Sequence, residues 1–231
     1  MPTKKPSSAN KTKANSGEDI SWQAQKSAMT RDRILDAAIN CFINLGYTNV
    51  TTAKVASTAG VSRGAMLHHF PSKTELIQAA VEYLHDHLLE DYSQRVNKIP
   101  KSKKGAKRRR AGLDVYWDHL TGDLAVAYHE LCVAGRTDPE LHEILEQSSA
   151  RFAHHVLETN SELFDEWSDR EDRFLLAMDV TKFMMEGMAL GQLTADGKKR
   201  IPLLLDYLAD RLEEIFEEGD STAIARHAGK K

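Results

Sequence analysis

Apolar residues recur at spacings of three and four along most of this chain of 231 residues, and no stretch alternates apolar and polar positions between turns as a strand does. The first such run starts at Thr30 and closes at Gly46, with apolar positions at Ile34, Leu35, Ala38, Cys41, Phe42 and Leu45. The pattern predicts an all-α protein of about nine helices, with a small N-terminal module followed by a larger helical bundle.

Two short helices and one long helix are predicted after this first run. The short helices cover Ala53–Ala59, which Gly60 ends, and Arg63–His69, which Ser62 caps and Pro71 follows. Ser72 and Glu75 then have the spacing of a capping box, and we expect a long helix from this point to about Val96.

The segment 97–112 interrupts the helical pattern. It contains Pro100, two glycines and seven basic residues between Lys101 and Arg110, which favours a linker and a boundary. Further helices are predicted at Leu113–Leu120, from Thr121 or Gly122 to Gly135, from the Asp138–Pro139 cap toward Phe164, at Glu171–Leu193 and at Arg200–Phe216.

Four regions follow from this pattern. Residues 1–25 are basic and poor in apolar side chains, so we expect a disordered arm, and residues 221–231 are expected to be a disordered tail. The N-terminal module is expected at 26–80 and the helical bundle at 81–220.

Charge is distributed unevenly along the chain, although the net charge is only −3. Residues 1–110 hold 19 Lys and Arg against 9 Asp and Glu, a net charge of +10, whereas residues 111–231 hold 12 against 25, a net charge of −13. A basic front half favours an anionic partner such as nucleic acid.

Composition excludes several other classes of protein. The longest uncharged apolar run is far too short to span a bilayer and the first residues lack a secretory signal, so we expect a cytoplasmic protein without a membrane partner. Cys41 and Cys132 cannot form a disulfide framework, and their apolar neighbours favour buried, inert thiols. His129 and Cys132 lack further ligands at a recognised spacing, so neither a metal site nor a cofactor is expected.

The two short helices have the chemistry of a helix-turn-helix. Polar residues form the outer face of the second one, where Arg63 at its start has donors suited to guanine O6 and N7. Gly64 and Ala65 keep this face slim, and Ala65 suits contact with a thymine methyl group. Thr52 and Lys73 each stand at a helix start, where exposed amides and the helix dipole favour a phosphate.

The same stretch resembles the N-terminal signature of the tetracycline-repressor (TetR) family over residues 30 to about 80. The resemblance rests on Gly46-Tyr47, Thr51-Thr52, Val55-Ala56, the run from Ala59 to Gly64, the run from His68 to Lys73, and Leu76. It implies phosphate contacts at Thr52 and Lys73, base-facing positions at Arg63, Gly64 and Ala65, and a backbone contact at His69. The family usually has an aromatic residue where this chain has Leu67, so that phosphate contact is missing here and His68 is the candidate to replace it.

In this family the C-terminal domain is a divergent helical domain that dimerises and often holds an effector pocket. The helix Glu171–Leu193 is apolar nearly all round, and Arg200–Phe216 has an apolar stripe, so two copies of each are expected to form a four-helix interface; packing inside one subunit is the alternative. Aromatic and methionine side chains of the bundle are candidates for a ligand pocket: Tyr116, Trp117, Tyr128, Phe152, Met184 and Met188.

These observations predict a homodimeric transcriptional regulator, more plausibly a repressor than an activator, that a small molecule releases from a palindromic operator. A helical architectural DNA-binding protein without an effector is the first alternative. A helical-bundle enzyme is the second, and it is disfavoured because Glu82 and His85 form the only Glu-x-x-His pair and the chain has no Gly-rich phosphate loop.

Overall fold

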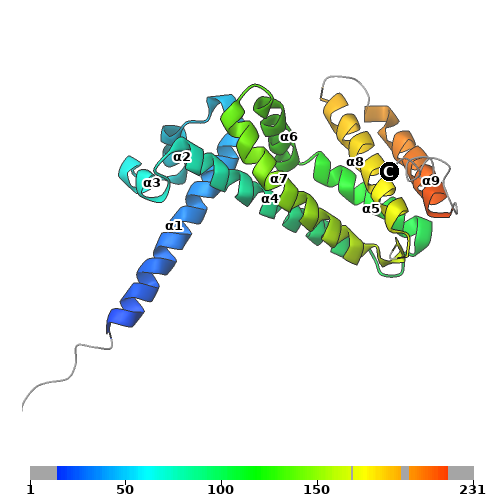
Figure 1. Cartoon of the computed structure of the whole chain (residues 1–231), viewed down its shortest axis with the longest axis horizontal. Helices are drawn as coiled ribbons and strands as arrows, with labels where there is room; N and C mark the ends of the chain where they lie inside the picture. Colours follow the sequence, from blue (N-terminus) through cyan, green and yellow to red (C-terminus); the bar gives the residue numbers. More distant parts are fainter. Residues whose placement is uncertain (1–14, 168, 194–197, 218–231) are drawn as a thin grey trace, which may run out of the picture.

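A computed structural model of the chain describes residues 15–167, 169–193 and 198–217. Within these ranges the protein is all-α, as predicted, and its shape is elongated (Figure 1). It has nine α-helices and three short 3-10 helices: α1 (Asn15–Leu45), η1 (Tyr47–Asn49), α2 (Thr52–Ala59), α3 (Arg63–His69), α4 (Lys73–Asn97), α5 (Gly105–Leu120), α6 (Asp123–Gly135), α7 (Pro139–Leu163), η2 (Asp165–Trp167), α8 (Glu171–Gly191), η3 (Lys198–Arg200) and α9 (Ile201–Glu217).

Side-chain caps explain why several helices begin where the sequence predicts. Ser62 Oγ accepts a hydrogen bond from the Ala65 amide at 3.1 Å, and Ser72 Oγ accepts one from the Glu75 amide at the same distance. Asp138 caps α7 in the same way and Pro139 follows at the first helical position. Each of these caps satisfies an amide that has no partner within its own helix.

The first helix begins earlier than expected. Residues 15–25 belong to α1, so the prediction of a disordered arm over 1–25 is wrong for this part, and residues 1–14 lie outside the described ranges. From Trp22 to Met29 every residue is exposed, and this end of α1 projects away from the rest of the molecule (Figure 1). Once a helix is nucleated by its packed part, each added residue extends it at little cost, without a core to cover it. The expected tail at 221–231 also lies outside the described ranges.

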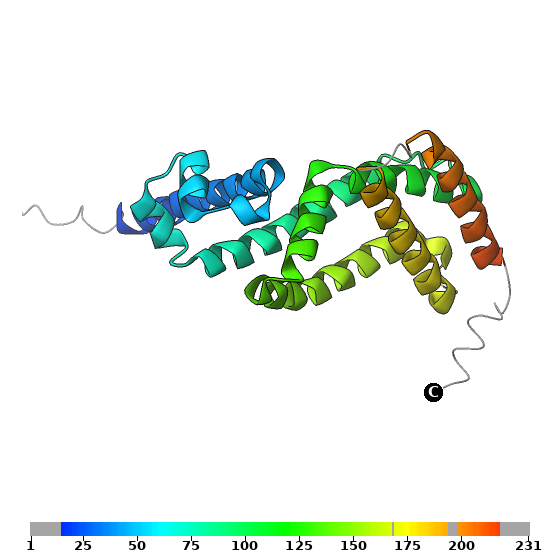
Figure 2. The same cartoon turned by 90° about the horizontal axis from the view of Figure 1, so that it is seen from above.

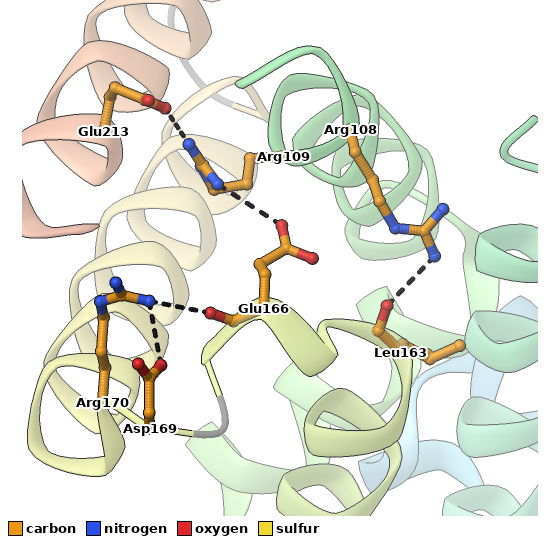
Figure 3. Close-up of polar contacts among 7 residues, drawn as sticks. All are labelled: Arg108, Arg109, Leu163, Glu166, Asp169, Arg170 and Glu213. Atoms are coloured by element: carbon orange, nitrogen blue, oxygen red, sulfur yellow. Dashed lines mark hydrogen bonds and ion pairs between the residues drawn. The ribbon is translucent and has the colours of Figure 1, made fainter. Parts of the chain in front are cut away.

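The predicted linker at 97–112 is shorter than expected, because α5 begins at Gly105 and includes the last basic residues of the run. Arg109 is only 6% exposed, and its guanidinium pairs with Glu166 at 3.4 Å and with Glu213 (Figure 3). The same guanidinium lies 4.2 Å from the ring centroid of Phe216. Arg108 donates to the carbonyl oxygen of Leu163 at 3.1 Å. The arginines at the end of the predicted linker are therefore held by partners from α7, η2 and α9.

Buried side chains form two main cores. The first joins the head, which we define as α1, α2 and α3, to α4, α6 and α7, with Phe42, Leu84 and Leu131 among its members. The second joins α5, α8 and α9 around Met185 and Leu208. We call the helices α5–α9 the body, and α4 runs continuously from the head into it. The head and the α8–α9 pair lie at opposite ends of the molecule in both views (Figures 1 and 2).

Among the described residues, no helix is both long enough and apolar enough to cross a bilayer.

Candidate nucleic-acid interface

The turn between α2 and α3 depends on Gly60. Its φ of +63° lies in the left-handed region, which strains any residue with a Cβ, and the Val61 amide just after it donates back to the Ala56 carbonyl oxygen at 3.0 Å. Val55 and Ala59 of α2 and Met66 of α3 are buried in the first core. The apolar faces of both short helices are thus held against α1, and the arrangement has the parts of a helix-turn-helix.

The seven predicted DNA contacts occupy the starts of three helices and the outer side of α3. Thr52, Arg63 and Lys73 are the first residues of α2, α3 and α4. Arg63, Gly64, His68 and Lys73 are exposed, whereas Thr52, Ala65 and His69 are half-buried. Their positions suit contact with a phosphate backbone and with base edges, and their role in DNA binding stays a prediction.

Nothing inside the protein requires glycine at position 64. A Cβ built there would meet only Ser62 Oγ, at 3.9 Å, and the backbone is ordinary helix. Arg63 likewise has no hydrogen bond or ion pair within the described part of the chain. Leu67, which stands where the family usually has an aromatic residue, is 44% exposed on the same short helix.

A cation–π contact links the end of α3 to α1, and two histidine rings meet within α3 itself. The guanidinium of Arg31 lies 5.3 Å from the ring centroid of Phe70, and the rings of His68 and His69 lie 5.4 Å apart. Burial, followed by the neighbouring His68 and Arg31, lowers the pKa of His69. His69 is therefore neutral at pH 7 and offers one donor and one acceptor instead of a positive charge.

The excess of positive charge in the first half of the chain is not concentrated at this interface. Seven of the 19 basic residues in 1–110 lie between Lys101 and Arg110. This segment follows α4 at its end away from the head (Figure 2), and Arg108, Arg109 and Arg110 all make contacts within the body. Part of the positive charge of residues 1–110 therefore belongs to the body and not to the head.

The predicted ligand-binding residues of the body border two different cores. Tyr128 and Phe152 border the first core, whereas Tyr116, Trp117, Met184 and Met188 border the second. Trp117 also lines an open groove of about 460 Å³ with Arg110, Ile201 and Leu205. The sequence pattern identified side chains that pack in the bundle, but it did not show which of them share a surface.

His85 is buried between Tyr128 and Phe152. Its ring stacks on Phe152 with centroids 4.3 Å apart and meets the Tyr128 ring edge-on at 5.0 Å. Burial lowers the pKa of His85 to about 4, and its Nε2 has no hydrogen-bond partner. The signal was present in the sequence, because His85 lies on the same helix face as the apolar residues Val81 and Leu88.

Two further polar contacts lie deeper in the body. His119 Nδ1 and Asp91 Oδ2 are 2.9 Å apart, and the hydrogen bonds from Arg95 and His119 lower the pKa of Asp91 despite its partial burial. His129 Nε2 lies 3.9 Å from Glu186 Oε1. Both contacts join residues from different helices, so the sequence alone did not reveal the pairs.

The two cysteines differ in their surroundings. Cys41 is buried, as expected. Cys132 is exposed, so the prediction of a buried thiol is wrong at this position. Desolvation still raises the pKa of the Cys132 thiol, so it is poorly nucleophilic. Within the described ranges no three His, Cys, Asp or Glu side chains are grouped so that they could hold a metal ion.

Comparison with known sequences gives a family match for the head. Residues 34–80 match the family model described as bacterial regulatory proteins, tetR family. The chain is 27% identical over 190 residues to an HTH-type transcriptional regulator of Mycobacterium tuberculosis, covering 80% of this chain and 96% of that protein. It is 30% identical to the HTH-type transcriptional regulator CymR of Pseudomonas putida, over 56% of this chain and 62% of CymR.

Solved structures share the fold over most of the chain. Salmonella enterica GusR has a TM-score of 0.59 at 17% identity, over 82% of this chain and 96% of GusR. The multidrug binding protein EbrR, solved with imidazole, has a TM-score of 0.56 at 21% identity, over 83% of this chain and 92% of EbrR. The likeness therefore extends beyond the head to the arrangement of the body helices.

Proposed function

Because residues 34–80 make this chain a transcriptional regulator of the tetR family, we propose that it acts as a dimeric repressor that a small molecule releases from a palindromic operator. The observation that carries this proposal is the two-sided character of α3: Met66 is buried in the core, while Arg63, Gly64 and His68 are exposed on the outer side. A recognition helix needs one face packed against its own protein and another face exposed, so that its side chains can contact DNA.

Dimerisation is supported by an apolar surface at the far end of the molecule. Phe183 on α8 is 68% exposed and Leu203 on α9 is 67% exposed, and Leu175, Leu190 and Tyr207 are exposed on the same two helices. We call these five residues the outer α8–α9 face. Large apolar side chains grouped in this way usually mark a protein–protein interface.

The structure also divides the apolar stripe of α9 into two faces. Ile201, Leu205 and Leu208 are buried in the core of the same subunit, whereas Leu203 and Tyr207 belong to the outer α8–α9 face. Gly187 of α8 is exposed, and a Cβ there would meet no atom within 4 Å. A second subunit can therefore approach α8 closely at this position.

The effector is proposed to bind in the body, between the two cores. Half-buried Glu186 lies there beside His129, and its charge contributes to raising the pKa of Tyr116 and Tyr128. These groups come from α5, α6 and α8, so a ligand that displaced one of them would move these helices relative to one another. A change of this kind would alter the separation of the two heads of the dimer and weaken operator binding.

Selection of operator DNA by the purified protein tests the proposal. We expect an enriched palindrome, and we expect Arg63→Ala to weaken its binding by about 1–3 kcal/mol and to relax preference at one base pair of each half-site. Recovery of no enriched sequence, or an identical sequence preference after Arg63→Ala, would contradict this reading of α3.

Thermal unfolding in the presence of a metabolite library tests effector release. A true effector should raise the melting temperature saturably and lower operator affinity over the same concentration range. Stabilising ligands that leave operator binding unchanged would argue for an architectural DNA-binding protein.

A further inference from the structure

Polar contacts hold the head against the body at one edge of the first core. On the side of the head lie Gly46 and Tyr47, which follow α1, and Lys73 and Thr74 at the start of α4. The body contributes Glu130 of α6 and Asp138 and Glu140 at the start of α7. We call these seven residues the head–body joint.

Tyr47 is attached to the body at both of its polar ends. Its amide donates to Glu130 Oε1 at 2.8 Å, and its hydroxyl donates to Asp138 Oδ2 at 2.8 Å. The side chain between them is buried. Because the two hydrogen bonds lead to different parts of the body, the head cannot rotate about one of them without breaking the other.

The bond to Asp138 is also tied to the start of α7. The other carboxylate oxygen of Asp138 accepts from the Leu141 amide at 3.1 Å and so caps that helix. This backbone hydrogen bond, followed by the one from Tyr47, lowers the pKa of Asp138, so the carboxylate is charged at neutral pH. Burial and the nearby carboxylate raise the pKa of Tyr47, which keeps its hydroxyl as a donor. Charge-assisted hydrogen bonds of this type are stronger than neutral ones.

Gly46 allows the close approach of Glu130. Its φ is +71°, and a Cβ at this position would lie 2.5 Å from Glu130 Oε1. The space among Tyr47, Lys73 and Leu141 measures only about 10 Å³. The joint is therefore closely packed and has no room for a ligand of its own.

The joint adjoins the predicted DNA contacts. Lys73, a predicted phosphate contact, is exposed and places its Nζ 5.5 Å from the ring centroid of Tyr47. Thr74, the next residue, donates to a carboxylate oxygen of Glu140. One turn of α4 thus faces the predicted phosphate position and the body at the same time.

We propose that Tyr47 and Glu130 are positioning residues, which set the orientation of each head and so the spacing between half-sites that the dimer accepts. This inference rests on the proposed function, because it requires two heads on one operator. Adding one base pair between half-sites moves them apart by about 3.4 Å and rotates them by about 35°, since B-DNA has 10–10.5 base pairs per turn. A head held at a fixed angle should reject such a change, and a loosened head should tolerate it.

Affinities for a series of operators test the inference. The selected palindrome is prepared with its half-site spacing shortened or lengthened by one and two base pairs, and binding is followed by fluorescence anisotropy. We expect the wild-type protein to prefer one spacing, and we expect Tyr47→Phe combined with Glu130→Ala to reduce that preference by about fivefold or more, which corresponds to about 1 kcal/mol. Tyr47→Phe alone should produce a smaller reduction in the same direction.

Two control variants separate positioning from general damage. Tyr83→Phe removes an equivalent hydrogen bond, from Tyr83 to Asp36 Oδ1 at 2.8 Å, that joins α4 to α1 without involving the body. Glu130→Gln keeps an acceptor for the Tyr47 amide. Both controls should keep the spacing preference, and all variants should bind a single half-site as the wild type does.

The outcomes are distinguishable. If the double variant loses stability toward urea but keeps the wild-type spacing preference, the joint is only structural and the inference is overturned. A loss of spacing preference in Tyr83→Phe equal to that in Tyr47→Phe would also overturn it. A wild-type protein without any preferred spacing would contradict the proposed dimeric binding itself, and the inference with it.

Discussion

At the scale of single residues, Gly60 and Gly64 illustrate two different reasons for glycine in the head. Gly60 has a positive φ, so the turn between α2 and α3 needs it. Gly64 has a helical backbone and open space around its missing Cβ, so folding does not need it. We therefore predict an external reason for this glycine, namely that a bare backbone lets α3 approach a base edge closely.

Replacement of Gly64 by alanine should therefore separate stability from DNA binding. We expect Gly64→Ala to raise the free energy of unfolding by up to about 1 kcal/mol, because alanine loses less backbone entropy in a helix. Operator binding should weaken by about 1–3 kcal/mol, comparable to a mismatched base pair. Urea unfolding and anisotropy titrations measure the two effects. Undiminished operator affinity would mean that α3 does not approach DNA at this position.

His85 links a single buried side chain to the pH dependence of stability. Its pKa of about 4 in the folded protein lies below the ordinary 6.5, because burial and then Arg151 oppose the charge more than Glu82 favours it. The unfolded chain therefore binds the proton first as the pH falls. The contribution of His85 to stability is complete above about pH 6.5 and is lost as the pH falls toward 4.

His85→Phe should remove this part of the pH dependence while keeping an aromatic ring against Phe152. Between pH 7.5 and pH 5, we expect the free energy of unfolding to fall by roughly 2 kcal/mol less in the variant than in the wild type. Urea unfolding at both pH values is the measurement. His87→Gln, on a half-exposed histidine two residues away, is the matched control and should behave like the wild type. Equal falls in all three proteins would show that His85 is not the titrating group.

At the scale of helices, ion pairs between α5 and α9 attach the basic residues of α5 to the rest of the body. The buried guanidinium of Arg109 connects α5 to Glu166 of η2 and Glu213 of α9, and its Nε has no partner (Figure 3). Arg110, the next residue, is more exposed and pairs with Asp206 at 2.9 Å. The two neighbours therefore have similar partners but different degrees of burial.

This difference predicts unequal effects of substitution. Arg109→Ala should lower the free energy of unfolding by about 2–4 kcal/mol, because two carboxylates lose their partner next to a cavity. Arg110→Ala should cost about 1 kcal/mol or less, as exposed ion pairs do. Chemical denaturation of both variants checks the prediction. Adding Glu166→Gln and Glu213→Gln to Arg109→Ala should restore part of the lost free energy of unfolding, because it removes the two unpaired carboxylates. If the free energy is not restored, the loss comes from packing of Arg109 on Phe216 instead.

At the scale of the whole molecule, the head and the α8–α9 pair lie at opposite ends (Figure 2). In the proposed dimer, contacts between subunits at the outer α8–α9 face would therefore set the distance between the two heads. Two heads must stand about 34–36 Å apart to reach successive major grooves on one face of DNA. The long helix α4 runs from the head into the body, and its 25 residues extend to roughly 37 Å.

A charge on the outer α8–α9 face should separate the subunits. We expect Phe183→Glu to give a monomer of about 26 kDa by light scattering at micromolar concentration, because a buried, unpaired carboxylate is costly in an apolar interface. Helical circular dichroism should be unchanged, and operator affinity should be lost. Val133→Glu, at an exposed apolar residue of α6, is the control and should keep the wild-type mass. A wild-type protein that is already monomeric, or operator binding by a proven monomer, would contradict the prediction.

Sequence patterns were most informative where structure is local. The ends of α3, α7 and α9 agree with prediction within about a residue, because caps and helical periodicity depend on residues no more than four positions apart. The helix-turn-helix was recognisable for the same reason. The early start of α1 was missed because its exposed N-terminal part has no apolar periodicity to mark it.

The amino-acid sequence by itself determined the helical class, most helix boundaries and the position of the helix-turn-helix. Only the tertiary structure decided that Leu205 faces inward while Leu203 faces outward, and that Arg109 finds Glu213, 104 residues later. It also decided that Tyr47 meets Asp138 across 91 residues of sequence. Such pairs depend on how several helices pack around a shared core, and no local spacing carries that information.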